Sequence, residues 1–443
     1  MRKTLSSQTQ QPISRRSFLK FGGGALAVAA GAYLMPEIVA AASRAAAPRS
    51  AAPIIGANGG YNYHLVATDG WISLPGTVVD TFNEVGPVTY LPDPAAPSPF
   101  TNYAFGFRDV TNYVDSPGGL TAEQKVRAQA NKTQAAAPWL FAEDGKELRI
   151  TLTNMGLVQR PDLTDGHSIH FHGFPNAIPV YDGVPELSVG VPIDKSFTYF
   201  YRPHDPGTYM YHCHFEDVEH VSMGMTGVIF VRPAGNPKNV YSNDGGASAY
   251  DREFPMILTE VWAQERWRDA HIQENDWSDY KPDYWAINGR VYPDTLAPNG
   301  GGSNPATGDL IAPAGRLDLQ YQPISSLVTC NAGEKVLIRI VNLGFQEQTM
   351  RVDGITFRVV GKDAKFLGAQ AYNTDAVDVG VGESFDLIFT APPKSGSGYD
   401  TYIFANSNLS RLHNPGVGGL GGQMTEIRVY AAGTLPTQTG PNA

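Results

Sequence analysis

The sequence is poor in cysteine and in basic residues, and each shortage excludes a class of protein. Only 2 cysteines, Cys213 and Cys330, occur in 443 residues, so no disulfide framework stabilises the fold and a hydrophobic core must do so. Lys and Arg number 33 against 43 Asp and Glu, which argues against nucleic acid as a partner because phosphate binding needs a basic face. Hydrophobic residues make up 42% of the chain, as in soluble globular proteins with a sizeable core.

Turn-forming and aromatic residues are, by contrast, abundant. The chain contains 47 Gly and 33 Pro, and 11% of its residues are aromatic. Many turns together with many aromatic residues favour an all-β architecture of sandwiches over helical bundles. The best helix candidate is residues 121–134, with Thr121 as the N-cap and Gln124 three residues later.

The chain also lacks an uninterrupted apolar run long enough for a strong membrane span. Residues 14–20 read Ser-Arg-Arg-Ser-Phe-Leu-Lys, and a Gly/Ala-rich stretch follows over residues 21–42. Paired arginines before such a stretch are typical of a twin-arginine export signal. A transmembrane anchor is the weaker alternative, because several glycines, Pro36 and Glu37 interrupt the stretch. We therefore predict a twin-arginine signal peptide at residues 1–47, no membrane span after its cleavage, and a periplasmic or secreted protein.

The rest of the sequence contains an internal repeat with a period of about 190 residues. In each copy a Gly precedes an Asn by nine residues, with an alternating strand pattern between them, at Gly145/Asn154 and at Gly333/Asn342. Two related β-domains follow from this repeat. The predicted divisions are a first domain at residues 48–235, a linker at 236–250, a second domain at 251–432 and a tail at 433–443.

Six of the ten histidines fall in two short runs. The first run reads His167-Ser-Ile-His170-Phe-His172-Gly173, and the second reads His212-Cys213-His214, followed by His220 and Met225. Successive residues of a strand point to opposite faces. Cys213 therefore lies on the face opposite to its two histidine neighbours, and His167 on the face opposite to the other two histidines of its run. Pairing the strands puts His167 with Cys213, and His170 and His172 with His212 and His214. The first group is completed by the imidazole of His220 and the thioether of Met225, which follow in the sequence.

The chemistry of the donors predicts copper in both groups. A thiolate and a thioether with two imidazoles are the ligands of a blue-copper site, whereas zinc more often recruits a second cysteine or a carboxylate. Met225 is the predicted axial ligand and Met223 a packing residue, while Cys330 is interpreted as an inert buried thiol. The second group offers four imidazoles and no thiolate, which suits Cu(II) or paired coppers that bind oxygen.

These two runs resemble the copper-binding motifs of the multicopper oxidases, and weaker similarity extends the resemblance over most of residues 138–432. The resemblance implies two Greek-key cupredoxin β-sandwich domains. It also implies type 1 copper in the first domain and half of a type 2/type 3 cluster in the second histidine group. It is closest to the two-domain branch of the family, in which a homotrimer shares clusters between subunits. An electron donor, either a small molecule or a metal ion, and oxygen are the implied partners, although no Met-rich segment indicates cuprous ions.

The second repeat departs from the family pattern, which requires four more imidazoles there. The position of His170-Phe-His172-Gly173 is occupied by residues 351–354, Arg-Val-Asp-Gly. The position of the second run is occupied by residues 405–407, Ala-Asn-Ser, or by residues 406–408 if the alignment shifts by one. Only His271 and His413 remain in that half, and His413 lies near the expected site.

Three functions remain open on the sequence alone. The first is an exported oxidase that takes electrons from a donor at type 1 copper and passes them to a second copper site for oxygen reduction. The second is a copper nitrite reductase relative, disfavoured because that family has an Asp where this chain has His170. The third is a non-enzymatic blue-copper electron carrier or copper-binding protein with an incomplete second site.

Overall fold

The structure is a computed structural model that describes residues 54–55, 59–82, 86–174 and 177–442. The predicted signal peptide therefore lies outside the described residues. Among the described helices, none combines the length and the apolar character that a membrane span needs.

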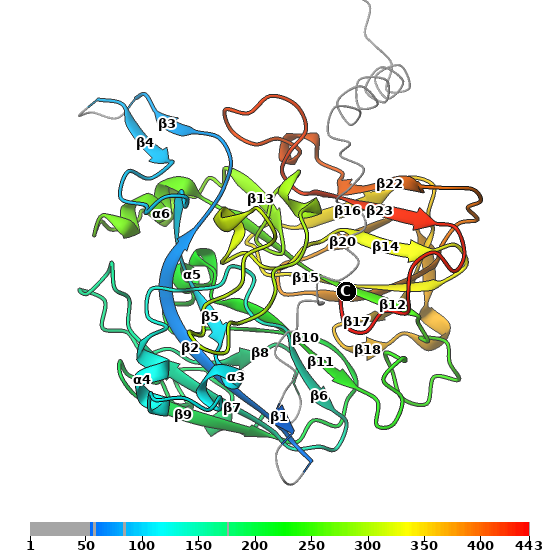
Figure 1. Ribbon diagram of the computed structural model, residues 1–443, viewed down its shortest axis with the longest axis horizontal. Helices are drawn as coiled ribbons and strands as arrows, with labels where there is room; N and C mark the ends of the chain where they lie inside the picture. The colour runs from blue at the N-terminus through cyan, green and yellow to red at the C-terminus, as the bar shows by residue number, and fades with distance from the viewer. Residues whose placement is uncertain (1–53, 56–58, 83–85, 175–176, 443) are drawn as a thin grey trace, which may run out of the picture. The chain divides into compact units, whose positions relative to one another are not determined.

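The first half of the described chain forms a sandwich of two sheets (Figure 1). One sheet runs in the order β1-β2-β7-β9 with β5 on β2, and the other in the order β6-β11-β10-β8. The strands are β1 (Ile54–Ile55), β2 (Tyr61–Ile72), β5 (Asn102–Asp109), β6 (Leu140–Glu143), β7 (Leu148–Asn154), β8 (His170–Phe171), β9 (Ser196–Tyr201), β10 (Gly207–His212) and β11 (Thr226–Arg232). A separate hairpin joins β3 (Val78–Asp80) to β4 (Val88–Leu91).

The second half forms a similar sandwich. Its sheets run in the orders β13-β12-β15-β21-β17-β18, with β19 on β17, and β14-β23-β22-β16-β20. The strands are β12 (Arg252–Val261), β13 (Tyr284–Ile287), β14 (Val328–Asn331), β15 (Lys335–Asn342), β16 (Gln348–Val352), β17 (Phe357–Lys362), β18 (Lys365–Phe366), β19 (Tyr372–Thr374), β20 (Ala376–Val379), β21 (Ser384–Thr390), β22 (Tyr399–Asn406) and β23 (Met424–Tyr430).

The two sandwiches repeat the same strand pairings. β2 is parallel to β7 as β12 is parallel to β15, and β6 is parallel to β11 as β14 is parallel to β23. The hydrogen bonds after the repeated Asn also match: Asn154 and Asn342 each accept a bond from the backbone two residues later, and each donates to the carbonyl of a valine 37 residues on. The prediction of an all-β protein built from two related sandwiches is confirmed.

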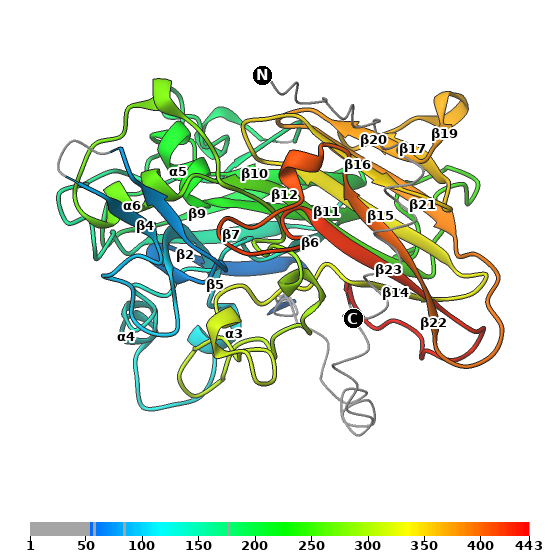
Figure 2. The same ribbon diagram turned by 90° about the horizontal axis from the view of Figure 1, so that it is seen from above.

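Strand β10 lies where the sandwiches meet, and all six of its residues are buried. Its alternate side chains face two cores: Tyr209 and Tyr211 pack in the core of the first sandwich, and Met210 packs against Ile257 and Val341 of the second. Figure 2 shows β10 and β11 beside β12 and β15. Burial on both faces fixes the register of this strand, so its last residue, His212, has a defined position.

A buried ionic network also joins the sandwiches. The Arg339 guanidinium contacts Glu253 at 3.2 Å and Asp386 at 3.4 Å, and all three side chains are at most 3% exposed. Arg339 also donates to Thr208 on β10 at 2.8 Å, and Thr208 donates to Asp386 at 2.6 Å. Each buried charge is thereby paired, as the low polarity of the interior requires.

Helices are few and short in the part of the chain that the structure describes. They are α3 (Thr111–Val114), α4 (Ala122–Arg127), α5 (Asp217–Met223) and α6 (Ala263–Ala270), with single 3-10 turns at Pro179–Tyr181, Trp277–Asp279, Asp294–Leu296, Leu317–Leu319, Gly368–Gln370 and Leu409–Arg411. The predicted capping box of Thr121 and Gln124 is present. The predicted extension of that helix to residue 134 is wrong, because the chain turns at Asn131 with a positive φ of 59° and Thr133 then bonds to the backbone of β2.

The segment proposed as a linker packs against the second sandwich. Val240, Tyr241 and Tyr250 are buried with Leu337 and Ile388.

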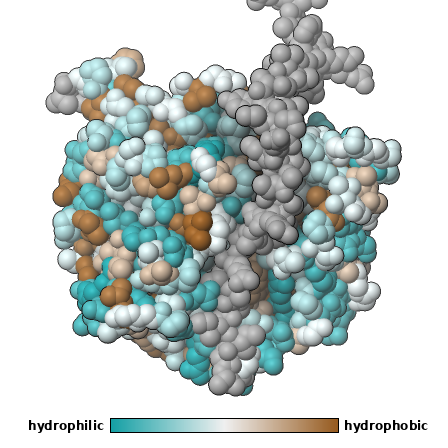
Figure 3. Space-filling view, viewed as in Figure 1, coloured by the Kyte–Doolittle hydropathy of each residue, from teal (hydrophilic) through white to brown (hydrophobic). Residues whose placement is uncertain are grey.

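The face of the molecule shown in Figure 3 is mostly hydrophilic, with small separate hydrophobic spots.

Candidate metal centres

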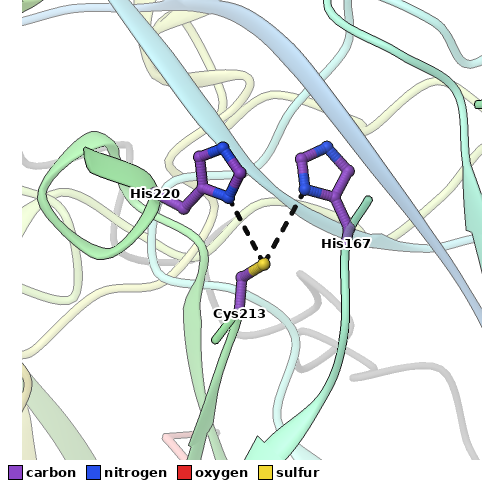
Figure 4. A group of neighbouring side chains, drawn as sticks. All are labelled: His167, Cys213 and His220. Atoms are coloured by element: carbon purple, nitrogen blue, oxygen red, sulfur yellow. Dashed lines mark hydrogen bonds between the residues drawn. The ribbon is translucent and has the colours of Figure 1, made fainter. Parts of the chain in front are cut away.

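The structure brings together three of the four side chains predicted for the first group. The Sγ atom of Cys213 lies 3.4 Å from Nδ1 of His220 and 3.7 Å from Nδ1 of His167. The donor atoms of these three residues all lie within 4.8 Å of one another, and all three residues are buried. Figure 4 shows both imidazoles side by side, each with a ring nitrogen directed at the sulfur.

Three different local structures hold this first group. Cys213 directly follows β10, and its backbone N–H donates to the carbonyl of Met225. His167 forms a two-bond bridge with Val191. His220 lies in α5, which ends at Gly224 with a φ of 119°. A Cβ at Gly224 would lie 2.8 Å from the carbonyl oxygen of Phe105, so only glycine fits this turn.

Burial sets the protonation of the first group. It raises the pKa of the Cys213 thiol to about 11 and lowers the pKa of His220 to about 4. The pKa of His167 is also lowered by burial. At neutral pH both imidazoles are therefore neutral and have a lone pair for a metal, while the thiolate needs a bound cation to form. Nε2 of His220 is buried with no hydrogen-bond partner among the described residues. This dry set of one sulfur and two nitrogens fits copper.

The sulfur-containing side chains of Met223, Met225 and Cys330 are also buried, two of them in the same core as this group and one in the core of the other sandwich. Met225 and Met223 are both fully buried in the core of the first sandwich. Met225 lies between Gly224 and β11, beside Cys213 through the backbone bond described above. Cys330 is buried on β14 in the core of the second sandwich, and burial raises its pKa to about 12, as expected of an unreactive thiol.

The second group gathers three imidazoles, with a fourth nearby. The donor atoms of His170, His172 and His212 lie within 4.8 Å of one another, and Nε2 of His172 is 2.9 Å from Nε2 of His212. The ring of His214 lies 5.0 Å from that of His170 between centroids, but His214 is outside the compact set of three. Strands β8 and β10 create this arrangement by pairing His170 directly with His212.

Backbone carbonyls orient all three of these rings. Nδ1 of His170 lies 2.7 Å from the carbonyl of Asp182, and Nδ1 of His212 lies 2.6 Å from that of Cys213. Nδ1 of His172 faces the carbonyl of Gly382 at 3.4 Å. A carbonyl can only accept, so each Nδ1 carries the proton and each Nε2 keeps a lone pair for a metal. No local pattern in the sequence indicates Asp182 or Gly382 as partners of these rings.

The two groups are connected through one residue. Cys213 contributes its sulfur to the first group, and its carbonyl accepts the hydrogen bond from His212 of the second. Its neighbours in the chain, His212 and His214, are on the side of the second group. A short path of covalent bonds and one hydrogen bond therefore joins the groups.

Two clefts reach the second group from the solvent. The larger, of about 700 Å³, is lined by His170, His172, Asp182, Asp363 and Ser384 among others. The smaller, of about 240 Å³, opens beside His172, His212 and His214. Small molecules can therefore reach this group, in contrast to the buried first group.

The register of the second sandwich identifies what replaces the histidine runs there. Arg351 pairs with Ala405 as His170 pairs with His212, and Asn406 donates to the carbonyl of Gln423 as Cys213 donates to that of Met225. The register thus selects Ala-Asn-Ser at residues 405–407 from the two alignments that the sequence left open.

Amide side chains fill the position equivalent to the first group. Asn406, at the position of Cys213, donates to Gln348 at 3.0 Å and to Gln423 at 2.6 Å. Arg411 donates to Gln348 at 2.9 Å, and Gln348 donates to Glu260. Sequence analysis missed this network, although Gln348 precedes Arg351 by the spacing that separates His167 from His170. These donors are already engaged with one another and do not form a copper site.

The other four histidines have other contacts. Nε2 of His64 lies 2.8 Å from the Thr153 hydroxyl, and His204 lies 3.6 Å from Asp144. His271 stacks on Trp267, in the Trp/Tyr-rich segment that contains α6. His413 is exposed. Within the described residues, none of these four belongs to either metal-binding group.

A buried carboxyl beside α5 makes stability depend on pH. Burial raises the pKa of Glu265 to about 8 from 4.5, and Ser222 donates to its Oε2 at 2.6 Å. Between about pH 4.5 and 8 the folded chain holds a proton on Glu265 that the unfolded chain has lost. The stabilisation that comes from this proton is therefore fully present below about pH 4.5 and is lost as the pH rises through about 8. The free energy of unfolding of copper-free protein should therefore fall between about pH 5 and 8.5. We expect Glu265→Gln to make this fall smaller by a few kcal/mol.

Urea unfolding at the two pH values measures this effect. The matched control is Glu123→Gln, because the side chain of Glu123 is 75% exposed and its removal leaves the pH dependence unchanged. An equally steep fall in the Glu265→Gln protein would contradict the prediction.

Comparisons with known proteins agree with this fold. Two family models, both described as multicopper oxidase, match residues 120–236 and 253–421. Laccase-3 of Botryotinia fuckeliana is 26% identical over 264 residues, 59% of this chain and 49% of that protein. Laccase-15 of Oryza sativa subsp. japonica is 27% identical over 284 residues, 57% of this chain and 41% of that protein. The chain thus spans about half the length of these curated relatives.

Solved structures show the same fold. The blue copper oxidase from Nitrosomonas europaea is 20% identical and has a TM-score of 0.56, with 83% of this chain and 85% of that chain covered. The multicopper oxidase mgLAC is 18% identical with a TM-score of 0.55, covering 85% and 88%. The fold and the thiolate–imidazole group define a copper protein of the cupredoxin type. More specifically, the chain belongs to the multicopper oxidase family, whose members bind copper.

Proposed function

We propose that this protein is an exported copper oxidase. Electrons from a donor enter at His167, Cys213, His220 and Met225 and pass to the second histidine group, where oxygen accepts them. Copper, when bound, supplies the one-electron chemistry. The residues of the chain hold it, exclude water from the first group and leave the second group open to the solvent.

The connection through Cys213 is the observation that carries this proposal. Cys213 supplies the sulfur of the buried group and, through its carbonyl, the hydrogen bond to His212 of the open group. An electron carrier needs only the first group. A second, solvent-accessible group connected by this path favours an enzyme with separate sites for donor and acceptor.

Donor recognition is proposed at the exposed end of α5. Glu216 and Asp217 are exposed at the start of α5, the helix that carries His220 of the first group, and their charges favour cationic or phenolic donors. Asp217 also lines the smaller cleft beside the second group. Glu219 is less available, because it lies 3.6 Å from Arg160. The twin-arginine pattern of residues 14–20 supports export to the periplasm or secretion, and a homotrimer is the assembly proposed from the family resemblance.

The electron carrier remains the second candidate. It is favoured by the second sandwich, where Arg351, Asp353, Ala405 and Ser407 occupy the positions of the missing imidazoles. A nitrite reductase is a weaker candidate, since His170 occupies the position of its aspartate.

Oxygen uptake by copper-loaded protein tests the proposal. We expect uptake on addition of 2,6-dimethoxyphenol, measured with an oxygen electrode, and none from copper-free protein. A blue protein that consumes no oxygen with this or several other donors would contradict the oxidase and support the carrier. Nitrite consumption under anaerobic conditions would instead support the nitrite reductase.

A further inference from the structure

We infer that His170, His172 and His212 form a mononuclear metal site complete within one chain, and that oxygen there is reduced by two electrons to hydrogen peroxide. This inference rests on the proposed oxidase function. It differs from the cluster of several coppers that the family resemblance implies.

The distances between the nitrogen atoms fit one ion. An imidazole nitrogen lies about 2 Å from a bound metal, so two such nitrogens at a right angle are roughly 2.8 Å apart. Nε2 of His172 and Nε2 of His212 are 2.9 Å apart, and the His170 donor completes a set within 4.8 Å. The carbonyls that hold the three rings belong to this same chain. Three oriented donors are therefore available without a second subunit.

The second sandwich offers no imidazole or thiolate to either cleft for further copper ions, since Asp363 and Ser384 in the larger cleft are oxygen donors, and such donors suit magnesium or calcium rather than copper. The second sandwich contributes Leu343, Gly344, Phe345, Val381 and Gly382 to the smaller cleft, and none of these side chains binds a metal. A Cβ at Gly382, where φ is 75°, would lie 3.1 Å from two atoms of the His172 ring. A side chain at this position is thus strained by the backbone conformation and would press on the His172 ring.

The other histidines of the described chain do not supply the imidazoles that a cluster of several copper ions would need. His214 is the remaining histidine near the group, and its Nδ1 lies 3.9 Å from Asp217. The equivalent strands of the second sandwich present Arg351 and Ala405 at the positions of the paired histidines, so these strands of a second copy would bring no histidine to the cleft. One further imidazole is too few to hold two more copper ions.

The number of metal ions limits the number of electrons. One ion in the thiolate group and one in the three-imidazole group store two electrons, supplied by two one-electron oxidations of a phenolic donor. Oxygen takes these two electrons and two protons from the solvent, which enters through the cleft of about 700 Å³. Two O–H bonds form and the O–O bond stays intact, so the product is hydrogen peroxide. Water as the product would require four electrons and cleavage of that bond.

Copper content tests the site separately from activity. In Cys213→Ser, which removes the thiolate of the first group, we expect one copper per chain by metal analysis. Its electron paramagnetic resonance spectrum should be that of a single isolated Cu(II) with nitrogen ligands. His172→Ala added to Cys213→Ser should abolish this copper, with His172→Gln as a second variant if the first fails to fold. His214→Ala should retain it, as should the control His204→Ala at a site 58% exposed.

Three coppers per chain in Cys213→Ser, or loss of copper in His214→Ala, would overturn the mononuclear site while leaving the oxidase proposal intact. Absence of copper from Cys213→Ser would also overturn it.

Product analysis tests the two-electron step. With 2,6-dimethoxyphenol we expect one hydrogen peroxide per oxygen consumed, and catalase should return half of that oxygen. Oxygen uptake without peroxide, and with no effect of catalase, would overturn the two-electron step alone. Absence of any oxygen uptake would overturn this step together with the oxidase proposal, whereas the copper count decides the mononuclear site in either case.

Discussion

Replacing Cys213 with serine is expected to remove the blue colour of the copper-loaded protein and to reduce donor-dependent oxygen uptake to the background of copper-free protein. Serine keeps the size of the side chain but replaces a soft thiolate by a hydroxyl, which does not form a blue-copper site. It also removes the sulfur at the start of the path to His212. Visible absorption, electron paramagnetic resonance and oxygen uptake measure the change.

The second cysteine provides the matched control. Cys330 is equally buried but lies in the core of the second sandwich. In Cys330→Ser we expect the blue colour and the oxygen uptake to persist, with a loss of stability of about 1–3 kcal/mol from the buried hydroxyl. Colour that survives in Cys213→Ser, or disappears in Cys330→Ser, would show that the copper–thiolate assignment is wrong.

Arg339→Met is expected to lower the free energy of unfolding by about 3–5 kcal/mol, because it removes one partner of a buried ionic network. Glu253 and Asp386 would remain buried, and Thr208 on β10 would lose a contact across the sandwich interface. Chemical denaturation of copper-free protein measures the effect without a contribution from metal binding.

Arg351→Met is the control for this second change. Arg351 also contacts two aspartates, Asp353 and Asp375, but its side chain is 53% exposed, and exposed ion pairs contribute less than about 1 kcal/mol. Equal decreases in the free energy of unfolding of the two variants would contradict the role assigned to Arg339. They would show that burial does not increase the stability lost when an arginine is removed from its ion pairs.

Strand parity explains why the sequence predicted much of the candidate site. Cys213 follows a strand whose residues alternate between two cores, so its orientation relative to His212 can be predicted from position alone. The grouping of His167 with Cys213 follows from the same rule. The all-β class follows from the repeat and from the content of Gly, Pro and aromatic residues.

The remaining features depend on contacts that local sequence patterns do not encode. His220 lies in a seven-residue helix that begins after Glu216, a non-glycine residue with a positive φ of 42°, and no cap pattern indicates this start. The carbonyl that faces His172 belongs to Gly382, 210 residues away. The alignment of Asn406 with Cys213 was open to a shift of one residue, which only the hydrogen bonds between strands resolve.

The amide network of the second sandwich has a consequence for protein engineering. Gln348, Asn406 and Gln423 occupy the backbone positions that carry His167, Cys213 and Met225 in the first sandwich. Replacing them by His, Cys and Met would put a thiolate, a thioether and an imidazole on an equivalent backbone, with Arg411 and His413 as neighbouring positions for a second imidazole. The duplicated scaffold therefore offers a starting point for a designed chain with two light-absorbing centres at a fixed separation.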